Sequence, residues 1–234
     1  GLIEALVPLF EDQHTCRVDV IAVGSGKALR LGERGDVDVV LVHAQPDEDQ
    51  FMSAGHGVRR EDVMYNRFEL LGPVADPAGI KGMEVTEALQ RIVVGKHRFV
   101  SRGDDSGTHK RELSLWREDD EDMPSGWDNY MESGQGMGAT LVMADQMKAY
   151  TLSDRGTYIA FKNKIDLVPL IPASEPLINP YGIMTVNPGK NDRIQHDLAN
   201  AFVDFIISPE TQWIVGDFRL AGETLFHPLH LASN

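Results

Sequence analysis

The chain has 234 residues, of which 42% are hydrophobic and 25% charged, as expected of a soluble globular protein with one large domain or two small ones. Its formal net charge of −14 argues against nonspecific binding to nucleic acid or to an acidic membrane surface, because both need a field of Lys and Arg. The single cysteine, Cys16, excludes a disulfide framework and a multi-cysteine metal site, and no apolar run is long enough to span a bilayer.

Helical and strand patterns alternate along the chain. In the first half, the apolar spacing predicts a helix over residues 2–11, strands at 18–23, 37–42 and 68–71, and a helix over 85–94. In the second half, we expect a short strand at 98–101, helices around 109–116 and 139–150, strands near 167–171 and 183–186, and a helix over 194–207 ended by Ser208-Pro209. This order predicts an α/β fold with parallel sheets.

Two turn-rich stretches are the candidate hinges of this fold. They are residues 72–82 (GPVADPAGIKG) and residues 172–180 (PASEPLINP). Between them lies a central segment of about 100 residues. If the chain crosses between lobes at both stretches, one lobe is continuous and the other is built from both chain ends.

Three loops place glycine and hydroxyl residues where a helix is predicted to begin. They are Gly24-Ser25-Gly26, the run SRGDDSGT at 101–108, and GQGMG at 134–138. Free backbone N–H groups and the positive end of the helix dipole make such a position suited to an anion. A Ser, Thr or Asp before a helix is more often a simple cap, and for Ser25 alone that interpretation is favoured. The 101–108 run favours a binding site, because a cap needs one such residue.

Other sequence motifs that could indicate a function are incomplete. Gly24 to Lys27 resembles part of a P-loop, but Ile21 stands where its first glycine would be and Ala28 where its Ser or Thr would be. Residues 134–139 fit a GxGxxA dinucleotide fingerprint, yet the preceding WDNYMES is not predicted to be a strand. The eight histidines show no metal-ligand spacing, so neither a protein-bound metal nor a cofactor is expected.

Several longer stretches carry a family resemblance. They are IAVGSGKALRLGERGDVDVVLVHA, GVRREDVMYNRFELLGP, FVSRGDDSGTHKRELSLW, ESGQGMGATLVMAD, YTLSDRGTYIAFK and NPYGIMTVNP. Together they resemble the tungstate-specific solute-binding proteins of bacterial ABC transporters, and the resemblance covers nearly the whole chain. SRGDDSGTH is its specific element, whereas SGT alone is similar to oxyanion binders more widely.

The resemblance implies a two-lobed α/β fold of the type II periplasmic-binding kind, with a two-segment hinge. It assigns residues 1–74 and 181–234 to one lobe and 75–180 to the other. It also implies a protein that is not an enzyme. Such a protein captures tungstate or molybdate in a cleft between the lobes and delivers it to an ABC permease. The alternatives are a phosphate- or sulfate-type oxyanion binder, or the ligand-sensing domain of a regulator with this fold.

The resemblance also assigns donors to the ligand. Ser25 would donate from the first lobe, and Arg102, Ser106, Gly107 and Thr108 from the second. Arg155, in the SDRGTY run, is a weaker candidate, for which a surface or salt-bridging role is equally expected.

The family begins with a strand and a Thr/Ser-rich loop, whereas this sequence starts inside the helix that follows them. We therefore expect residues before Gly1 in the working protein, which would be periplasmic or extracellular and could be anchored through that segment without itself inserting into the membrane.

Overall fold

The computed structural model describes residues 1–117 and 127–231. The chain forms two compact units. Unit 1 contains residues 1–65, 180–219 and those from 224 onward, and unit 2 contains residues 66–179 and 220–223. The chain therefore passes from one unit to the other at residues 65–66, within the strand β2 (Gly57–Gly72), and at residues 179–180, within the strand β7 (Ile178–Val186). The first crossing precedes the turn-rich stretch 72–82, whereas the second lies at the end of the stretch 172–180.

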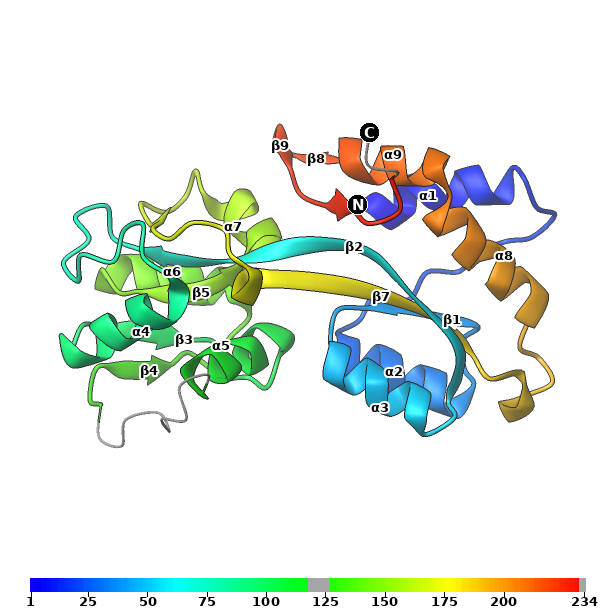
Figure 1. Cartoon of the computed structure of the whole chain (residues 1–234), viewed down its shortest axis with the longest axis horizontal. Coiled ribbons are helices and arrows are strands. Elements are labelled where there is room, and N and C mark those ends of the chain that lie inside the picture. The colour runs from blue at the N-terminus through cyan, green and yellow to red at the C-terminus, as the bar shows by residue number, and fades with distance from the viewer. Residues whose placement is uncertain (118–126, 232–234) are drawn as a thin grey trace. The chain divides into compact units, whose positions relative to one another are not determined.

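Unit 1 is built on the sheet order β1-β7-β2-β10, in which β1 (Val39–Val42) pairs antiparallel with β7, and β10 (His227–Pro228) antiparallel with β2. Successive residues of β7 point to opposite faces, so Ile183 packs with one apolar cluster and Met184 with another. The first cluster is covered by α1 (Leu2–Glu11), α8 (His196–Ile207) and α9 (Pro209–Asp217), and the second by α2 (Ser25–Arg34) and α3 (Gln45–Ser53) (Figure 1).

Unit 2 contains the second half of β2 and the following elements: α4 (Val85–Val94), β3 (Phe99–Ser101), α5 (Gly107–Arg117), β4 (Tyr130–Glu132), α6 (Met137–Met147), β5 (Thr151–Asp154), α7 (Arg155–Phe161), β6 (Val168–Pro169) and the 3-10 turn Glu175–Leu177. A second 3-10 turn, Pro188–Lys190, lies in unit 1. The short strands β8 (Arg219–Leu220) and β9 (Glu223–Thr224) form a hairpin that belongs partly to each unit.

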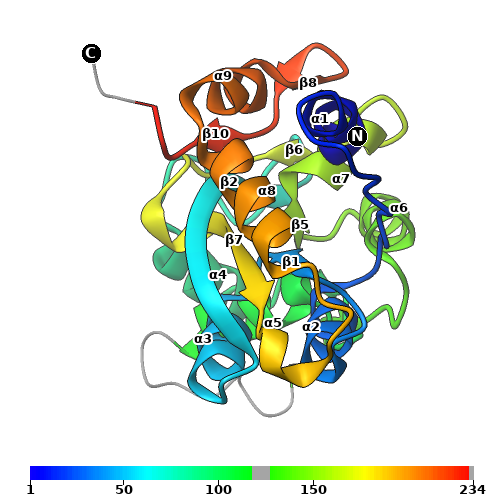
Figure 2. The ribbon, with the colours of Figure 1, turned by 90° about the vertical axis from the view of Figure 1, so that its right-hand side faces the viewer.

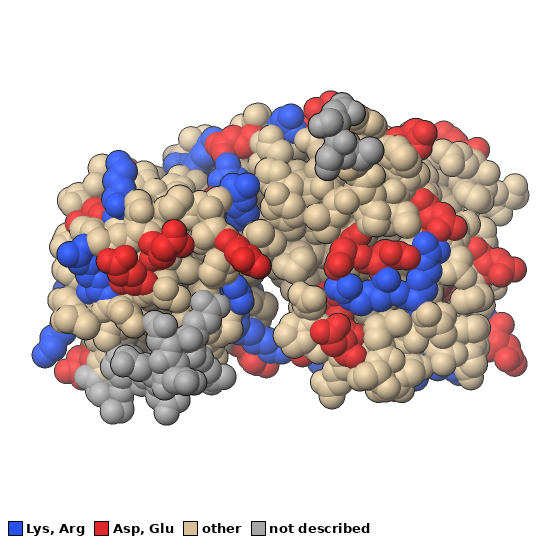
Figure 3. All heavy atoms as spheres, in the orientation of Figure 1, with Lys and Arg blue, Asp and Glu red and all other residues tan. Residues whose placement is uncertain are grey.

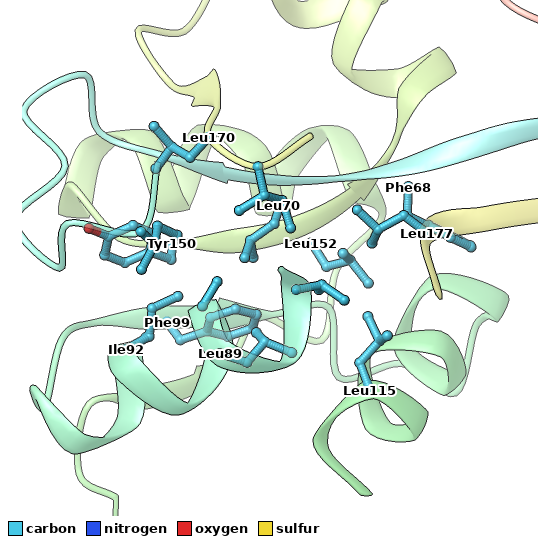
Figure 4. Close-up of a cluster of buried hydrophobic side chains, with 14 of the residues drawn as sticks. Phe68, Leu70, Leu89, Ile92, Phe99, Leu115, Tyr150, Leu152, Leu170 and Leu177 are labelled. Carbon is cyan, nitrogen blue, oxygen red and sulfur yellow. The ribbon is translucent and has the colours of Figure 1, made fainter. Parts of the chain in front are cut away.

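The main apolar core of unit 2 joins α4, β3, α5 and β5 (Figure 4). Phe99 of β3 is fully buried at its centre and meets Tyr150 and Leu152 from the segment around β5. Val100, the next residue, faces a separate cluster with Leu141 of α6. Both faces of β3 are therefore fixed by packing, and the loop after β3 starts from a rigid base.

The predicted parallel strand direction is wrong for most of the described strand pairs. The pairs of β2 with β5, β6 and β10 and of β1 with β7 are antiparallel, whereas β3 with β4 and the bridge from Phe99 to Tyr150 are parallel. The α/β class itself holds, because helices pack on both faces of the sheet of unit 1 and around the strands of unit 2. An almost fully apolar run indicates burial on both faces, which helices provide whatever the direction of the strand.

Residues 18–23 do not form the predicted strand. Val20 and Ile21 are 49% and 54% exposed, and the N–H of Val18 donates to the carboxylate of Glu11 at 2.6 Å instead of to a neighbouring strand. The β-branched residues of this run favour an extended chain, but a strand also needs a hydrogen-bonded neighbour.

Two further elements were not predicted, the helix α9 and the strand β4. Ser208 and Pro209 end α8 as predicted, yet they also begin α9, which follows α8 directly (Figure 2). The Ser208 hydroxyl accepts from the N–H of Thr211, and Pro209 occupies the first turn of α9. A strand, β4, does precede the glycine loop at 134–138, contrary to expectation.

Candidate functional site

A short loop in unit 2, residues 102–106, connects β3 to α5. Together with the first two residues of α5 it forms the segment 102–108, here called the 102–108 loop, which carries four of the five predicted ligand residues. Both of its ends are anchored in the core. The ring of Phe99 in β3 stands edge-on to Trp116 of α5 at a centroid distance of 5.3 Å. It also stacks on Tyr130 of β4 at 5.9 Å. The last residue of β3, Ser101, is fully buried. The loop is therefore held at a fixed position above this core.

The loop is shaped by its own residues. Gly103 has a positive φ of 61°, and a Cβ there would lie 2.6 Å from the Cβ of Glu132, so only glycine fits. The N–H of Ser106 donates to Asp104 Oδ1 at 3.1 Å. The N–H of Asp105, a residue with φ of 58°, donates to His109 Nδ1 at 3.1 Å. These contacts define one loop conformation without the help of a ligand.

Arg102 offers a partly buried cation at this loop. Its Nε lies 2.8 Å from Asp104 Oδ2, and its side chain is 23% exposed. The Nη groups contact no acceptor among residues 1–117 and 127–231. Burial opposes ionisation of Asp104, but hydrogen bonds from Ser106 and the charge of Arg102 lower its pKa below its ordinary value. Asp104 therefore stays ionised at neutral pH and orients the guanidinium, whose outer N–H groups remain available to an anion.

The first turn of α5 supplies neutral donors beside this arginine. The Ser106 hydroxyl accepts from the N–H of His109 at 3.4 Å, and the Ser106 carbonyl accepts from Lys110 at 2.8 Å. The N–H groups of Gly107 and Thr108 precede the first intrahelical bond and lack a helical acceptor. Thr108, the second residue of α5, is only 4% exposed and carries a hydroxyl donor. Arg102, Ser106, Gly107 and Thr108 are thus brought together in unit 2.

A second helix N-terminus lies next to the first. The carbonyl of Arg102 accepts from the N–H of Gly134 at 3.0 Å and from the hydroxyl of Ser133 at 3.1 Å. Three residues later α6 begins, with Gly136 as a cap that provides no side-chain hydrogen bond. At Gly138 the α6 backbone packs so closely on α7 that a Cβ would lie 2.4 Å from the Phe161 ring. The glycine loop at 134–138 therefore supports the Arg102 loop.

Ser25 lies in unit 1 and is described by itself. It is the first residue of α2, with Gly24 as the cap and no side-chain capping bond. The first helical hydrogen bonds come from Lys27 and Ala28 to the Gly24 carbonyl, at 2.9 and 3.0 Å. The N–H of Ser25 and its hydroxyl are therefore free of intrahelical acceptors, as a donor to an anion requires.

Arg155 has other partners. It is the first residue of α7, and its Nη1 donates to Glu69 of β2 while its Nη2 donates to Glu223 at 2.9 Å. Lys162 also donates to Glu223. The hydrogen bond from Lys162 lowers the pKa of Glu223. Arg155 is therefore an ion-paired arginine, and neither of its two acceptors belongs to the 102–108 loop.

Sequence reasoning missed one residue near the loop, Glu112. It is 1% exposed and accepts hydrogen bonds from Ser101, Tyr130 and Trp116. Its position could have been found from spacing. Residues 108, 112, 115 and 116 recur at helical intervals and are all buried, so Glu112 falls on the apolar face of α5.

The face of the molecule in Figure 3 shows no large basic field, because acidic and basic side chains are interspersed on it. In the described segments, no helix has the length and apolarity to cross a membrane, and no cluster of His, Cys, Asp and Glu has the makings of a metal site. The anion-binding potential of unit 2 therefore rests on one guanidinium and local N–H and O–H donors.

Residues 1–210 match the model of the PBP superfamily domain. A tungstate-binding protein TupA of Peptoclostridium acidaminophilum is 43% identical, over 97% of this chain and 81% of that protein. The chain belongs to the PBP superfamily and to its TupA family. In solved structures, the TupA tungstate-binding protein of Desulfovibrio alaskensis G20 is 43% identical with a TM-score of 0.92, over 98% of this chain and 93% of that one.

A further solved structure supports membership of the TupA family. It is described as the tungstate ABC transporter from Geobacter sulfurreducens and is 51% identical, with a TM-score of 0.81, over 93% of each chain. The PBP superfamily supplies the two-lobed architecture expected from the sequence. The TupA family consists of solute-binding proteins of ABC transporters and is not a family of enzymes, as expected.

Proposed function

We propose that this protein captures tungstate outside the cytoplasm and delivers it to the permease of an ABC importer, without catalysing a reaction. The observation that carries the proposal is the loop 102–108. There a guanidinium, the hydroxyl of Thr108 and the free N–H groups of α5 are held together by the local fold. Membership of the TupA family supports tungstate as the ion.

The loop favours an ion without protons. Tungstate is a dianion that carries no proton near neutral pH, so it needs only donors. Phosphate keeps a proton there and needs an acceptor. Each oxygen of Asp104 already has a partner, Ser106 for one and Arg102 for the other, so this carboxylate has less capacity left to accept a proton from phosphate. Donors alone do not separate tungstate from molybdate or sulfate, which are also unprotonated.

Each proposed binding residue has a role. Arg102 supplies the charge, Thr108 and Ser106 supply hydroxyl donors, and Gly107 supplies a backbone N–H. Ser25 supplies a hydroxyl donor from unit 1. Arg155 is less suited, because two carboxylates already hold its guanidinium. No cofactor is part of the proposal.

Calorimetric titration with tungstate, molybdate, sulfate and phosphate tests the proposal directly. We expect tungstate or molybdate to bind far more tightly than phosphate, and competition between ions to give the same order. Tighter binding of phosphate than of tungstate contradicts the proposal and returns the chain to the phosphate-type alternative.

A further inference from the structure

Glu112 is a buried acid one helical turn away from the proposed anion donors. It follows Thr108 by four residues in α5, so the two side chains lie on the same face of the helix. Its Oε2 accepts from the Ser101 hydroxyl at 2.8 Å. Its Oε1 accepts from the Tyr130 hydroxyl at 2.8 Å and from Trp116 Nε1 at 3.2 Å. These contacts tie the carboxyl group to both ends of the Arg102 loop.

The groups that contact this carboxylate are all uncharged. No Lys or Arg forms an ion pair with Glu112 within the described residues. Burial raises the pKa of Glu112 above its ordinary value, against the smaller effects of its three hydrogen bonds and of the charge of His109. Burial also raises the pKa of Tyr130, and the charge of Glu112 adds to that effect. A charge in this position is therefore poorly compensated before any anion arrives.

A proton fits on Glu112 without the loss of any contact. Oε1 can keep the hydrogen bonds from Tyr130 and Trp116, while a protonated Oε2 donates to the Ser101 oxygen. The nearby His109 differs, because its Nδ1 accepts the N–H of Asp105 and would lose that bond on protonation. Of the two groups, Glu112 is the one at which proton uptake leaves the loop unchanged.

We propose that Glu112 takes up a proton when the oxyanion binds at the 102–108 loop. The inference rests on the proposed function. A dianion at the first turn of α5 raises the free energy of the ionised carboxylate one turn further along, and a proton removes that repulsion. The reaction is a simple transfer: one proton from water or buffer joins Glu112 Oε2, and one dianion joins the loop.

The other charged groups around Glu112 do not replace this role. Asp104 is ionised and paired with Arg102, and Asp105 is exposed. Glu132 of β4 is also exposed. The helix α4 packs on α5 and carries the exposed Glu87 and Arg91, with Glu84 just before its first residue. The strand β5 also packs on α5, and its Asp154 caps α7 by accepting from Thr157.

Calorimetry of tungstate binding in buffers of different ionisation enthalpy counts the protons taken up. The range of about pH 5.5 to 8.5 lies above the ordinary pKa of Glu and spans that of His. We expect a fractional uptake, up to one proton per ion, in the native protein. Tungstate affinity should correspondingly fall as the pH rises, by up to about tenfold per pH unit where uptake is complete.

The variant Glu112→Gln should abolish this uptake. Its amide oxygen can accept from Tyr130 and Trp116 and its amide nitrogen can donate to Ser101, so it imitates the protonated acid. Its affinity should match the native protein at low pH and exceed it at high pH. Glu132→Gln makes the same charge change at an exposed site and should leave the uptake as it is in the native protein.

Three results decide against the inference. Tungstate binding without proton uptake in the native protein overturns it and leaves the proposed function intact. Uptake that persists in Glu112→Gln and disappears in His109→Gln assigns the proton to the histidine instead. If Glu112→Gln does not fold, the native pH series still decides, since a tungstate Kd independent of pH overturns the inference. Absence of any tungstate binding rejects the proposed function itself.

Discussion

Replacing Arg102 by alanine removes the guanidinium whose Nη groups lack an acceptor in the described part of the chain. A hydrogen bond that involves a charged group contributes roughly 1.5–3 kcal/mol. Two such bonds to a bound dianion then account for about 3–6 kcal/mol, which is roughly 100- to 10,000-fold in Kd at about 1.4 kcal/mol per tenfold. We expect Arg102→Ala to weaken tungstate binding within this range.

Part of that loss comes from Asp104. Its Oδ2 lies 2.8 Å from Arg102 Nε, so removal of the guanidinium leaves an unpaired carboxylate beside the anion. The double variant Arg102→Ala/Asp104→Asn should therefore bind more tightly than Arg102→Ala alone, and the difference measures the repulsion. Arg102→Lys should also bind more weakly than the native protein, because an ammonium group cannot reproduce a planar pair of donors.

Calorimetric titration with tungstate measures these affinities, and thermal unfolding checks that each variant is folded. Arg98→Ala is the matched control. Arg98 precedes β3, is exposed, and donates to the Met147 carbonyl at 3.2 Å, so its removal changes the net charge equally at the other end of the same strand. A Kd for Arg102→Ala within about threefold of the native value, equal to that of the control, would show that the loop is not the anion site.

Three further predictions concern Thr108, Arg155 and Glu223. Thr108→Val keeps the buried volume but removes the hydroxyl donor, so calorimetry should show a loss of about 0.5–1.5 kcal/mol in binding with little change in melting temperature. Arg155→Gln should lower the melting temperature but leave the tungstate Kd nearly unchanged, because its bonds go to Glu69 and Glu223. A tenfold weaker Kd would make Arg155 a ligand residue. The Glu223 pKa is lowered by Lys162, so its contribution to stability is present above the ordinary pKa of 4.5 and should be lost as the pH falls below it, in the native protein more than in a Glu223→Gln variant.

Helices whose own residues show a clear apolar pattern were predicted with the correct first and last residues. The helices α1 and α4 begin and end where their apolar spacing does, because each buries one stripe against its sheet. The loop 101–108 was found for a similar reason, since its arginine, hydroxyls and glycines are adjacent in sequence. Such features need no knowledge of the rest of the fold.

Features that depend on distant partners were missed. The sequence predicted only residues 68–71 of β2, although the strand runs from Gly57 to Gly72. Its first six residues, GVRRED, look like a polar loop. In the structure Arg60 is neutralised by the buried Glu48, and Arg59 pairs with Asp204 of α8. The partners that make a charged strand acceptable lie at distant points in the chain, and no local pattern reveals them.

The net charge of −14 does not conflict with capture of a dianion, because most of it is remote from the proposed donors or exposed to solvent. Asp104 is paired with Arg102, Asp105 is exposed, and exposed acids more than about 8 Å away are largely screened at physiological salt. Glu112 differs from these acids, since it is buried, close to the donors and hydrogen-bonded only by uncharged groups. If it stayed ionised, it would oppose the helix N-terminus that attracts the anion. A protonated Glu112 leaves the guanidinium and the N–H groups of α5 to act on the ion without that opposition, so the acidity of one buried side chain would set the pH range in which the loop binds.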